Sequence, residues 1–247
     1  MISLKELNEV KEKRKTSLYY EEKEYIQYIF LNAISKFHDN FVFKGGTCLR
    51  ICHGLERASE DLDFTTNLNV SRIKEVVKKC LKDFDLLNIE YEKYSEKEFE
   101  GNIRIEVRFK DPLFREKRSS TNTLKIDFNK RKSKKKVVKV VQKLFSDIPL
   151  FTLVVLDEEE ILAEKIRTLI NRSESKDMYD VWILLNKKVK IDRKLLFEKL
   201  KEEKSKFSDL RFPEKDEYGL ELKNLVYVLP TYEQVKMEVE AELKKFK

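Results

Sequence analysis

Hydrophobic side chains recur every three to four residues in several parts of the chain, a spacing that places them on one face of a helix. Over residues 19–37 this pattern predicts an amphipathic helix with Tyr25, Ile29 and Ala33 on its buried face. Further helices are predicted at residues 1–15, 48–53, 71–84 and 232–246.

Strands are predicted where apolar and polar residues alternate. In the segment DLDF, Asp61 and Asp63 alternate with apolar residues, so a strand would place both carboxylates on one face of a sheet. The apolar run at residues 41–43 predicts a short buried strand, with Gly45-Gly46 as the turn that follows it. Further strands, in a mixed or antiparallel sheet, are predicted at residues 87–94, 102–109, 121–128 and 137–141.

The pattern changes at Asp157, which has a glutamate three residues further on and so predicts a helix start. The rest of the chain is predicted to be helical apart from breaks at Pro213 and Pro230. The sequence therefore predicts an α+β protein with two domains. Residues 1–150 would form a mixed sheet flanked by helices, and residues 151–247 a helical domain that closes the active-site cleft.

The composition of the chain is consistent with a polyanionic partner. The chain has 247 residues and a net charge of +7, with 39% charged residues. Such a balance favours RNA as a partner, although a surface rich in ion pairs, as in heat-adapted proteins, explains it equally well. The basic run at residues 130–136 has the same two interpretations, a solvated hairpin tip or a nucleic-acid contact.

The compartment expected is the cytoplasm. Three cysteines are an odd number, and no secretory segment is recognisable, so free thiols in a reducing environment are expected. The longest apolar run, at residues 149–156, is far short of the roughly 18 residues that a membrane span needs. We therefore expect no membrane association.

Two carboxylates on one face of a strand provide the hard oxygen ligands that Mg²⁺ prefers. A third acid is expected from a neighbouring strand, and Asp127, between Ile126 and Phe128, has the right setting. Glu106 is a rival for this role. With metals to activate the attacking hydroxyl and stabilise the leaving pyrophosphate, no histidine base would be required.

The segment Gly45-Gly46-Thr47 predicts a phosphate-binding turn that opens a helix. Glycine lacks a Cβ, so the backbone N–H groups can approach phosphate oxygens closely, and the positive end of the helix faces the same anion. Alone the turn is a weak signal. Asp61 and Asp63, which follow it closely along the chain, make chemistry on a nucleoside triphosphate the preferred interpretation.

The combination of GGT with R-A-S-E-D-L-D-F resembles the AbiEii-like toxin nucleotidyltransferases, a branch of the polymerase-β-like superfamily and the toxins of type IV toxin-antitoxin systems. The resemblance implies a nucleotidyltransferase-type sheet in the N-terminal domain. It assigns metal binding to Asp61 and Asp63, and nucleotide binding to Gly45, Gly46 and Thr47. The nucleotide-binding residues would also include Arg57 and Ser59.

A second motif of the family appears in the helical half, where ILAEKIRTLINR is followed by KDMYDV. The resemblance implies that Lys165 is the catalytic lysine, which would neutralise triphosphate charge. It also implies a catalytic role for Asp180 and a nucleotide-binding role for Asp177, three residues apart on one helix face.

These residues predict an Mg²⁺-dependent enzyme that transfers a nucleoside monophosphate from an NTP and releases pyrophosphate. By analogy to the family, the acceptor expected is RNA, at a tRNA 3′ end. A cognate antitoxin is expected as well, although it need not bind the toxin directly. Two alternatives remain: an enzyme that modifies a protein or a small molecule, and a non-catalytic module that binds nucleotides for regulation.

Overall fold

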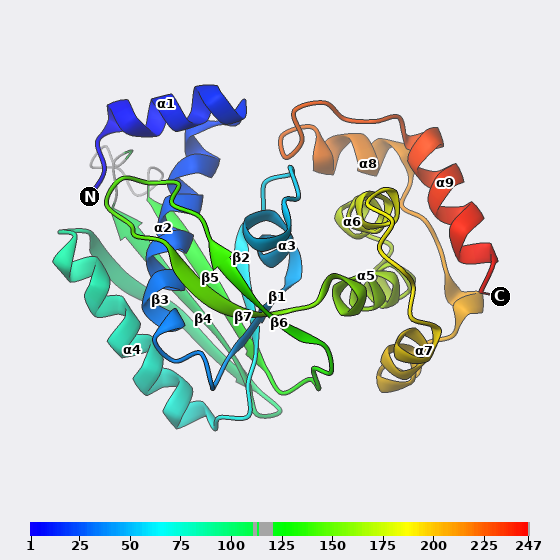
Figure 1. Ribbon diagram of the computed structural model, residues 1–247, viewed down its shortest axis with the longest axis horizontal. Coiled ribbons are helices and arrows are strands. Elements are labelled where there is room, and N and C mark those ends of the chain that lie inside the picture. Colours follow the sequence, from blue (N-terminus) through cyan, green and yellow to red (C-terminus); the bar gives the residue numbers. More distant parts are fainter. Residues whose placement is uncertain (111–112, 114–120, 247) are drawn as a thin grey trace. The chain divides into compact units, whose positions relative to one another are not determined.

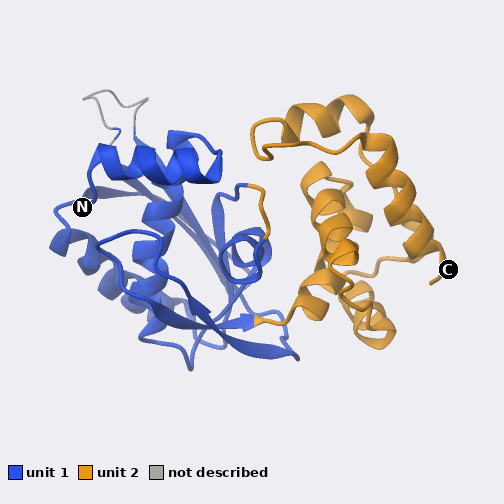
Figure 2. Cartoon of the chain, turned by 45° about the horizontal axis from the view of Figure 1, so that its top comes forward, with its two compact units in different colours: residues 1–54, 58–155 blue, residues 55–57, 156–247 orange. Residues whose placement is uncertain are grey.

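The computed structural model describes residues 1–110, 113 and 121–246 (Figure 1). The chain forms two compact units (Figure 2). Unit 1 contains Met1–Gly54 and Ala58–Val155, and unit 2 contains Leu55–Arg57 and Leu156–Lys247. The short segment 55–57 therefore belongs to the second unit although both of its chain neighbours belong to the first.

Within the described residues, the strands of unit 1 form one mixed sheet of seven strands in the order β3-β4-β5-β2-β1-β7-β6. Strands β3, β4 and β5 are antiparallel neighbours, β2 runs parallel to β5, and β1 runs antiparallel to β2 and parallel to β7. The bounds are β1 Val42–Lys44, β2 Asp61–Thr65, β3 Glu90–Phe99, β4 Asn102–Lys110, β5 Asn122–Asn129, β6 Lys136–Val141 and β7 Phe151–Leu156.

One face of this sheet is apolar and packs against helices α2 and α4, which contact each other. Phe30 of α2 lies against Phe64 of β2, and Phe84 of α4 lies 4.7 Å from Phe109 of β4, measured between ring centroids. Phe64 also stacks on Phe128 of the adjacent strand. Because side chains alternate along a strand, the opposite face of β2, β4 and β5 is polar. The helices of unit 1 are α1 Leu4–Arg14, α2 Leu18–Ser35, α3 Gly45–His53 and α4 Val70–Leu86.

Unit 2 is helical in its described part. Asp157 caps its first helix, since its side chain accepts a hydrogen bond from the N–H of Glu159 at 3.0 Å. Helices α5 and α6 pack together, and α7, α8 and α9 surround them. The bounds are α5 Glu158–Arg172, α6 Ser175–Asn186, α7 Arg193–Glu202, α8 Lys215–Leu222 and α9 Tyr232–Lys244, with a 3₁₀ turn at Phe207–Asp209.

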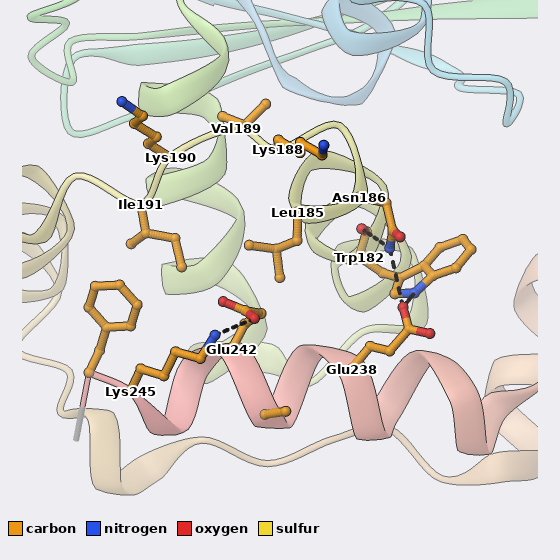
Figure 3. Close-up of a pocket in the computed structure, with 12 residues that line it drawn as sticks. Trp182, Leu185, Asn186, Lys188, Val189, Lys190, Ile191, Glu238, Glu242 and Lys245 are labelled. Carbon is orange, nitrogen blue, oxygen red and sulfur yellow. Dashed lines mark hydrogen bonds and ion pairs between the residues drawn. The ribbon is translucent and has the colours of Figure 1, made fainter.

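A groove of about 700 Å³ lies between α9 and the end of α6 (Figure 3). Trp182 lines this groove, and its indole N–H donates a hydrogen bond to Glu238 at 2.6 Å. In the described part of the chain, its lining includes none of the residues predicted for the active site. No described helix combines the length and apolarity that a membrane span requires.

The α+β fold class is confirmed, but the structure differs from the sequence-based expectations in three places. Gly45 and Gly46 are not a turn before the helix, because they form the first residues of α3. Residues 149–156 contain strand β7, which the sequence did not predict as a strand. The basic run is not a hairpin tip, because β5 and β6 are not neighbours in the sheet. It connects two distant strands, and Thr65 at the end of β2 donates a hydrogen bond to the carbonyl of Arg131.

Candidate active site

The two central aspartates lie on the polar face of the sheet. Asp61 and Asp63 are the first and third residues of β2, and Leu62 between them is fully buried on the other face. Parallel pairing with β5 sets Asp127 directly beside Asp63, and Lys125 beside Asp61. Register neighbours point to the same side of a sheet. The three acids therefore share one face, as the sequence predicts.

Gly45 is placed against Asp63 in a way that admits no side chain. Its φ of +80° is in the left-handed region, and a Cβ built on it would lie 2.3 Å from an Oδ of Asp63. Lys44, the residue before α3, provides no side-chain cap for this helix. The N-terminal end of α3 is therefore next to a carboxylate, and the helix dipole favours negative charge at that position.

Thr47 in the first turn of α3 and Ser59 in the loop before β2 are joined by a hydrogen bond. The Thr47 hydroxyl is buried and is hydrogen-bonded to the Ser59 hydroxyl at 2.9 Å and to the carbonyl of Asp61 at 2.5 Å. Gln27 of α2 holds the same loop, because its amide N–H groups donate to the carbonyls of Ser59 and Glu60. The contacts of Thr47 described here hold the loop in position. A phosphate-binding role for Thr47 and Ser59 stays a prediction.

Of the two candidates for a third acid, Asp127 is the closer to Asp63. Glu106 lies on β4, in register with Lys125, and is therefore one strand further from β2. Asp127 is held by Arg104, whose guanidinium donates to its two oxygens at 2.8 and 3.0 Å. Sequence spacing could not find this partner, because the contact depends on the register of β4 and β5.

The charges around Asp61 perturb each other. Burial raises the pKa of Asp61, Lys125 and Lys23 lower it, and the negative charge of Asp127 raises it further. Burial also lowers the pKa of Lys23, which lies on α2 and donates to the carbonyl of Thr123 at 2.7 Å. A carboxylate whose pKa is raised by the negative charge of a neighbouring carboxylate, as that of Asp61 is, favours a bound cation. Across the described residues, however, no group of three or more His, Cys, Asp or Glu side chains is arranged as a metal site.

The second set of predicted residues forms a buried network within unit 2. The Lys165 ammonium lies 2.9 Å from an Oδ of Asp177 and 2.7 Å from an Oδ of Asp180. Arg57 binds Asp180 through two hydrogen bonds of 2.6 and 2.7 Å, and Arg172 binds the second oxygen of Asp177 at 2.8 Å. Helices α5 and α6 thus meet through opposite charges, because Lys165 and Arg172 of α5 pair with aspartates of α6. Arg172 also pairs with Glu174 at 3.3 Å.

Both aspartates of this network are inaccessible to solvent. Burial would raise the pKa of Asp177, but the charges of Lys165 and Arg172 outweigh it and lower the pKa to about 2. The pKa of Asp180 is lowered as well, because Arg57 and Lys165 overcome the effect of burial. Both carboxylates are thus ionised at neutral pH and already paired.

The sequence matches a known protein family over most of its length. A sequence model of the family described as "Nucleotidyl transferase AbiEii toxin, Type IV TA system" matches residues 29–238. A search of curated proteins finds no match.

Two solved structures share the fold at 19% sequence identity. JHP933 from Helicobacter pylori has a TM-score of 0.60 over 94% of this chain and 93% of its own. MenT4, a nucleotidyltransferase toxin from Mycobacterium tuberculosis, has a TM-score of 0.58 over 93% of this chain and 94% of its own. At this identity they demonstrate a shared fold and nothing about substrates.

The motif, the fold and the family match define the chain as a nucleotidyltransferase. It belongs to the AbiEii family of nucleotidyltransferase toxins of type IV toxin-antitoxin systems.

Proposed function

We propose that the protein transfers a nucleoside monophosphate from an NTP to the 3′ end of an RNA, most specifically a tRNA, and releases pyrophosphate. One observation carries this proposal. Asp61, Asp63 and Asp127 line one face of the sheet, and the N-terminus of α3 approaches Asp63 at Gly45. A helix N-terminus attracts phosphate, and adjacent carboxylates attract the cation that accompanies it.

Nucleotidyltransferases generally use divalent metal ions, and we propose Mg²⁺ here. The donor set fits, because carboxylate oxygens are the ligands that Mg²⁺ prefers, and this ion is usually held by one or two carboxylates plus substrate phosphates. Asp61 and Asp63 would hold the ion directly, and Asp127 would add to the negative field with its orientation fixed by Arg104. The ion, when bound, would neutralise phosphate charge as the acceptor hydroxyl attacks.

We propose that Lys165 is the catalytic lysine that neutralises triphosphate charge and that Arg57 binds the nucleotide; both belong to unit 2. Asp177 and Asp180 hold Lys165, and Asp180 also holds Arg57. Arg172 pairs with Asp177 and, at 3.3 Å, with Glu174. Asp177 and Asp180 have no exposed surface, so we assign them as positioning residues that hold Lys165 and Arg57 in place. Such a network is costly to break, because removing one partner leaves an uncompensated buried charge.

RNA is proposed as the acceptor because the chain carries a net charge of +7. Action on tRNA would place the enzyme in the cytoplasm. As a toxin of a type IV system it has a cognate antitoxin, which we propose acts without a required direct contact.

The test is a transfer assay with Mg²⁺, each labelled NTP in turn, and a mixture of total RNA and protein. We expect label on RNA and its loss, by at least about 1,000-fold, in Asp63→Asn. Asp39→Asn is the matched control, since the Asp39 side chain is 86% exposed. Its transfer rate should equal that of the unchanged protein, and thermal unfolding checks that both variants are folded.

The other outcomes separate the alternatives. Label that appears on protein alone, or on a small molecule alone, would overturn the RNA acceptor and keep the enzyme. Nucleotide turnover that Asp63→Asn leaves unchanged would overturn the proposed site. Transfer that needs no divalent ion, measured after treatment with a chelator, would overturn the metal.

A further inference from the structure

The polar face of the sheet continues beyond the acids onto β4 and the edge strand β3. Buried residues of β4 such as Val107 and Phe109 face the helices, so Arg104 and Arg108 face the other side. In β3, Glu96 and Glu98 are on the helix side, since both form ion pairs with Lys74 of α4. The face of β3 and β4 that points away from the helices is therefore continuous with the face of β5 and β2 that carries the acids.

Two aromatic rings lie on this face of the edge strand with about half of their surface exposed. Tyr94 is 50% exposed, and the guanidinium of Arg108 lies 3.9 Å from its ring centroid. Phe99 is 51% exposed and pairs with Asn102, which is on the polar face because Ile103 next to it is fully buried. Both rings are therefore accessible to a partner that stacks on them.

Cations surround the Phe99 end of this face. Lys97 of β3 is exposed and pairs in register with Arg104, whose side chain is 45% exposed. Lys130 lies at the turn between β3 and β4, since a Cβ on Gly101 would be 3.5 Å from its ammonium nitrogen. The basic run at residues 130–136 continues directly from it.

The register connects these residues to the acids. Lys97, Arg104, Asp127 and Asp63 are successive partners across β3, β4, β5 and β2. Three strand spacings of about 4.8 Å put the edge strand about 14 Å from the acids. A ligand that lies across the strands can therefore touch the rings with one part and reach Asp63 with another.

We propose that a single-stranded segment of the acceptor RNA docks on this face, with bases stacked on Tyr94 and Phe99 and phosphates at Lys97, Arg104 and Lys130. Exposed aromatic rings among cations are the features that bind unpaired nucleic acid, because every base has a stackable face. The choice of RNA over another polyanion rests on the proposed function. We call the five residues the acceptor platform.

Fluorescence anisotropy with a labelled RNA oligonucleotide of about eight nucleotides tests the platform. We expect Tyr94→Ala and Phe99→Ala each to weaken binding by about tenfold, and Tyr94→Phe to retain it, since the ring remains. Tyr227→Ala is the matched control, because Tyr227 is 69% exposed in unit 2 and outside the platform. Its affinity should match that of the unchanged protein.

The outcomes distinguish the platform from the proposed reaction. If Asp63→Asn abolishes transfer but binds the oligonucleotide normally, while Tyr94→Ala loses binding, both proposals hold. If no RNA is modified yet Tyr94→Ala and Phe99→Ala still lose RNA binding, the platform stands and the proposed function falls. Unchanged RNA affinity in both alanine variants overturns the platform. If these variants keep their RNA affinity but lose binding to poly-glutamate, the face is a protein-docking surface instead.

Discussion

At the scale of single residues, the candidate site depends on the close approach of Gly45 to Asp63. Two constraints coincide at this glycine. Its φ is in the left-handed region, and a Cβ would lie 2.3 Å from the carboxylate. Gly54, at the other end of the same helix, has a φ of +70°, but a Cβ there would meet no atom within 4 Å. Substitutions at Gly45 and Gly54 therefore separate the effect of backbone strain, which both share, from that of steric exclusion, which only Gly45 has.

We predict that Gly45→Ala loses about 100-fold in kcat/KM, because Asp63 must move by an ångström or more to accommodate the methyl group. Gly54→Ala should keep its activity and lose only about 1 kcal/mol of unfolding free energy from the left-handed backbone. Steady-state kinetics and urea unfolding of both variants measure the two effects. Equal activity in the two variants would contradict a tight contact between Gly45 and Asp63.

At the scale of elements, the Asp177 carboxylate joins α6 to α5 through Lys165 and Arg172. Its pKa is about 2 in the folded protein, against about 3.9 for an aspartate in an unfolded chain. Because the folded state binds fewer protons between these values, the stabilisation is complete above about pH 5 and is lost as the pH falls through about 2. Its size is on the order of 2 kcal/mol.

We predict that Asp177→Asn unfolds more readily than the unchanged protein at pH 6, by about 2 kcal/mol or more, and that the difference shrinks toward pH 2. Urea unfolding followed by the fluorescence of Trp182, the single tryptophan, measures this in unit 2. The exposed Asp216 offers a control, since Asp216→Asn should follow the unchanged protein at every pH. A constant difference across this pH range would contradict the ion-pair network.

The local pattern of apolar and polar residues predicts most helices and strands but does not predict the order of the strands in the sheet. The predicted helix over residues 19–37 corresponds to α2, and the strand over residues 102–109 to β4, because each has a clear period of its own. Strand β7 lies in a short, continuous apolar run, which periodicity alone does not identify as a strand. The order of the strands rests on contacts between distant segments, so the crossover from β5 to β6 could not be read from local periodicity.

The same limit applies to the site. The acids were found by their spacing on a strand, and the register of β2 with β5 puts Asp127 beside Asp63 as expected. Arg104 and Arg172 were not predicted, because a lone arginine on a strand or helix has no local signature of its partner.

At the scale of the whole molecule, the net charge of +7 has two explanations that predict different responses to salt. A surface of mutually paired charges stabilises the fold and leaves little field for a partner. A surface that neutralises RNA phosphates releases counterions, so its affinity falls steeply as salt rises. For about four phosphates of a single strand, the loss between 50 and 200 mM salt is about 50-fold.

We predict a loss of this size for RNA binding, and a shallower dependence when Lys134, Lys135 and Lys136 are all changed to Gln. The positive charge of that segment would contribute to the field along the backbone without contacting bases, so the variant should weaken all RNA sequences alike. Changing Lys215, Lys223 and Lys236 of unit 2 to Gln removes the same net charge elsewhere and serves as the control. If the salt dependence of RNA affinity becomes shallower by the same amount in both triple variants, RNA responds to the total charge of the molecule. If the RNA affinity of the unchanged protein does not depend on salt, RNA is not its polyanionic partner.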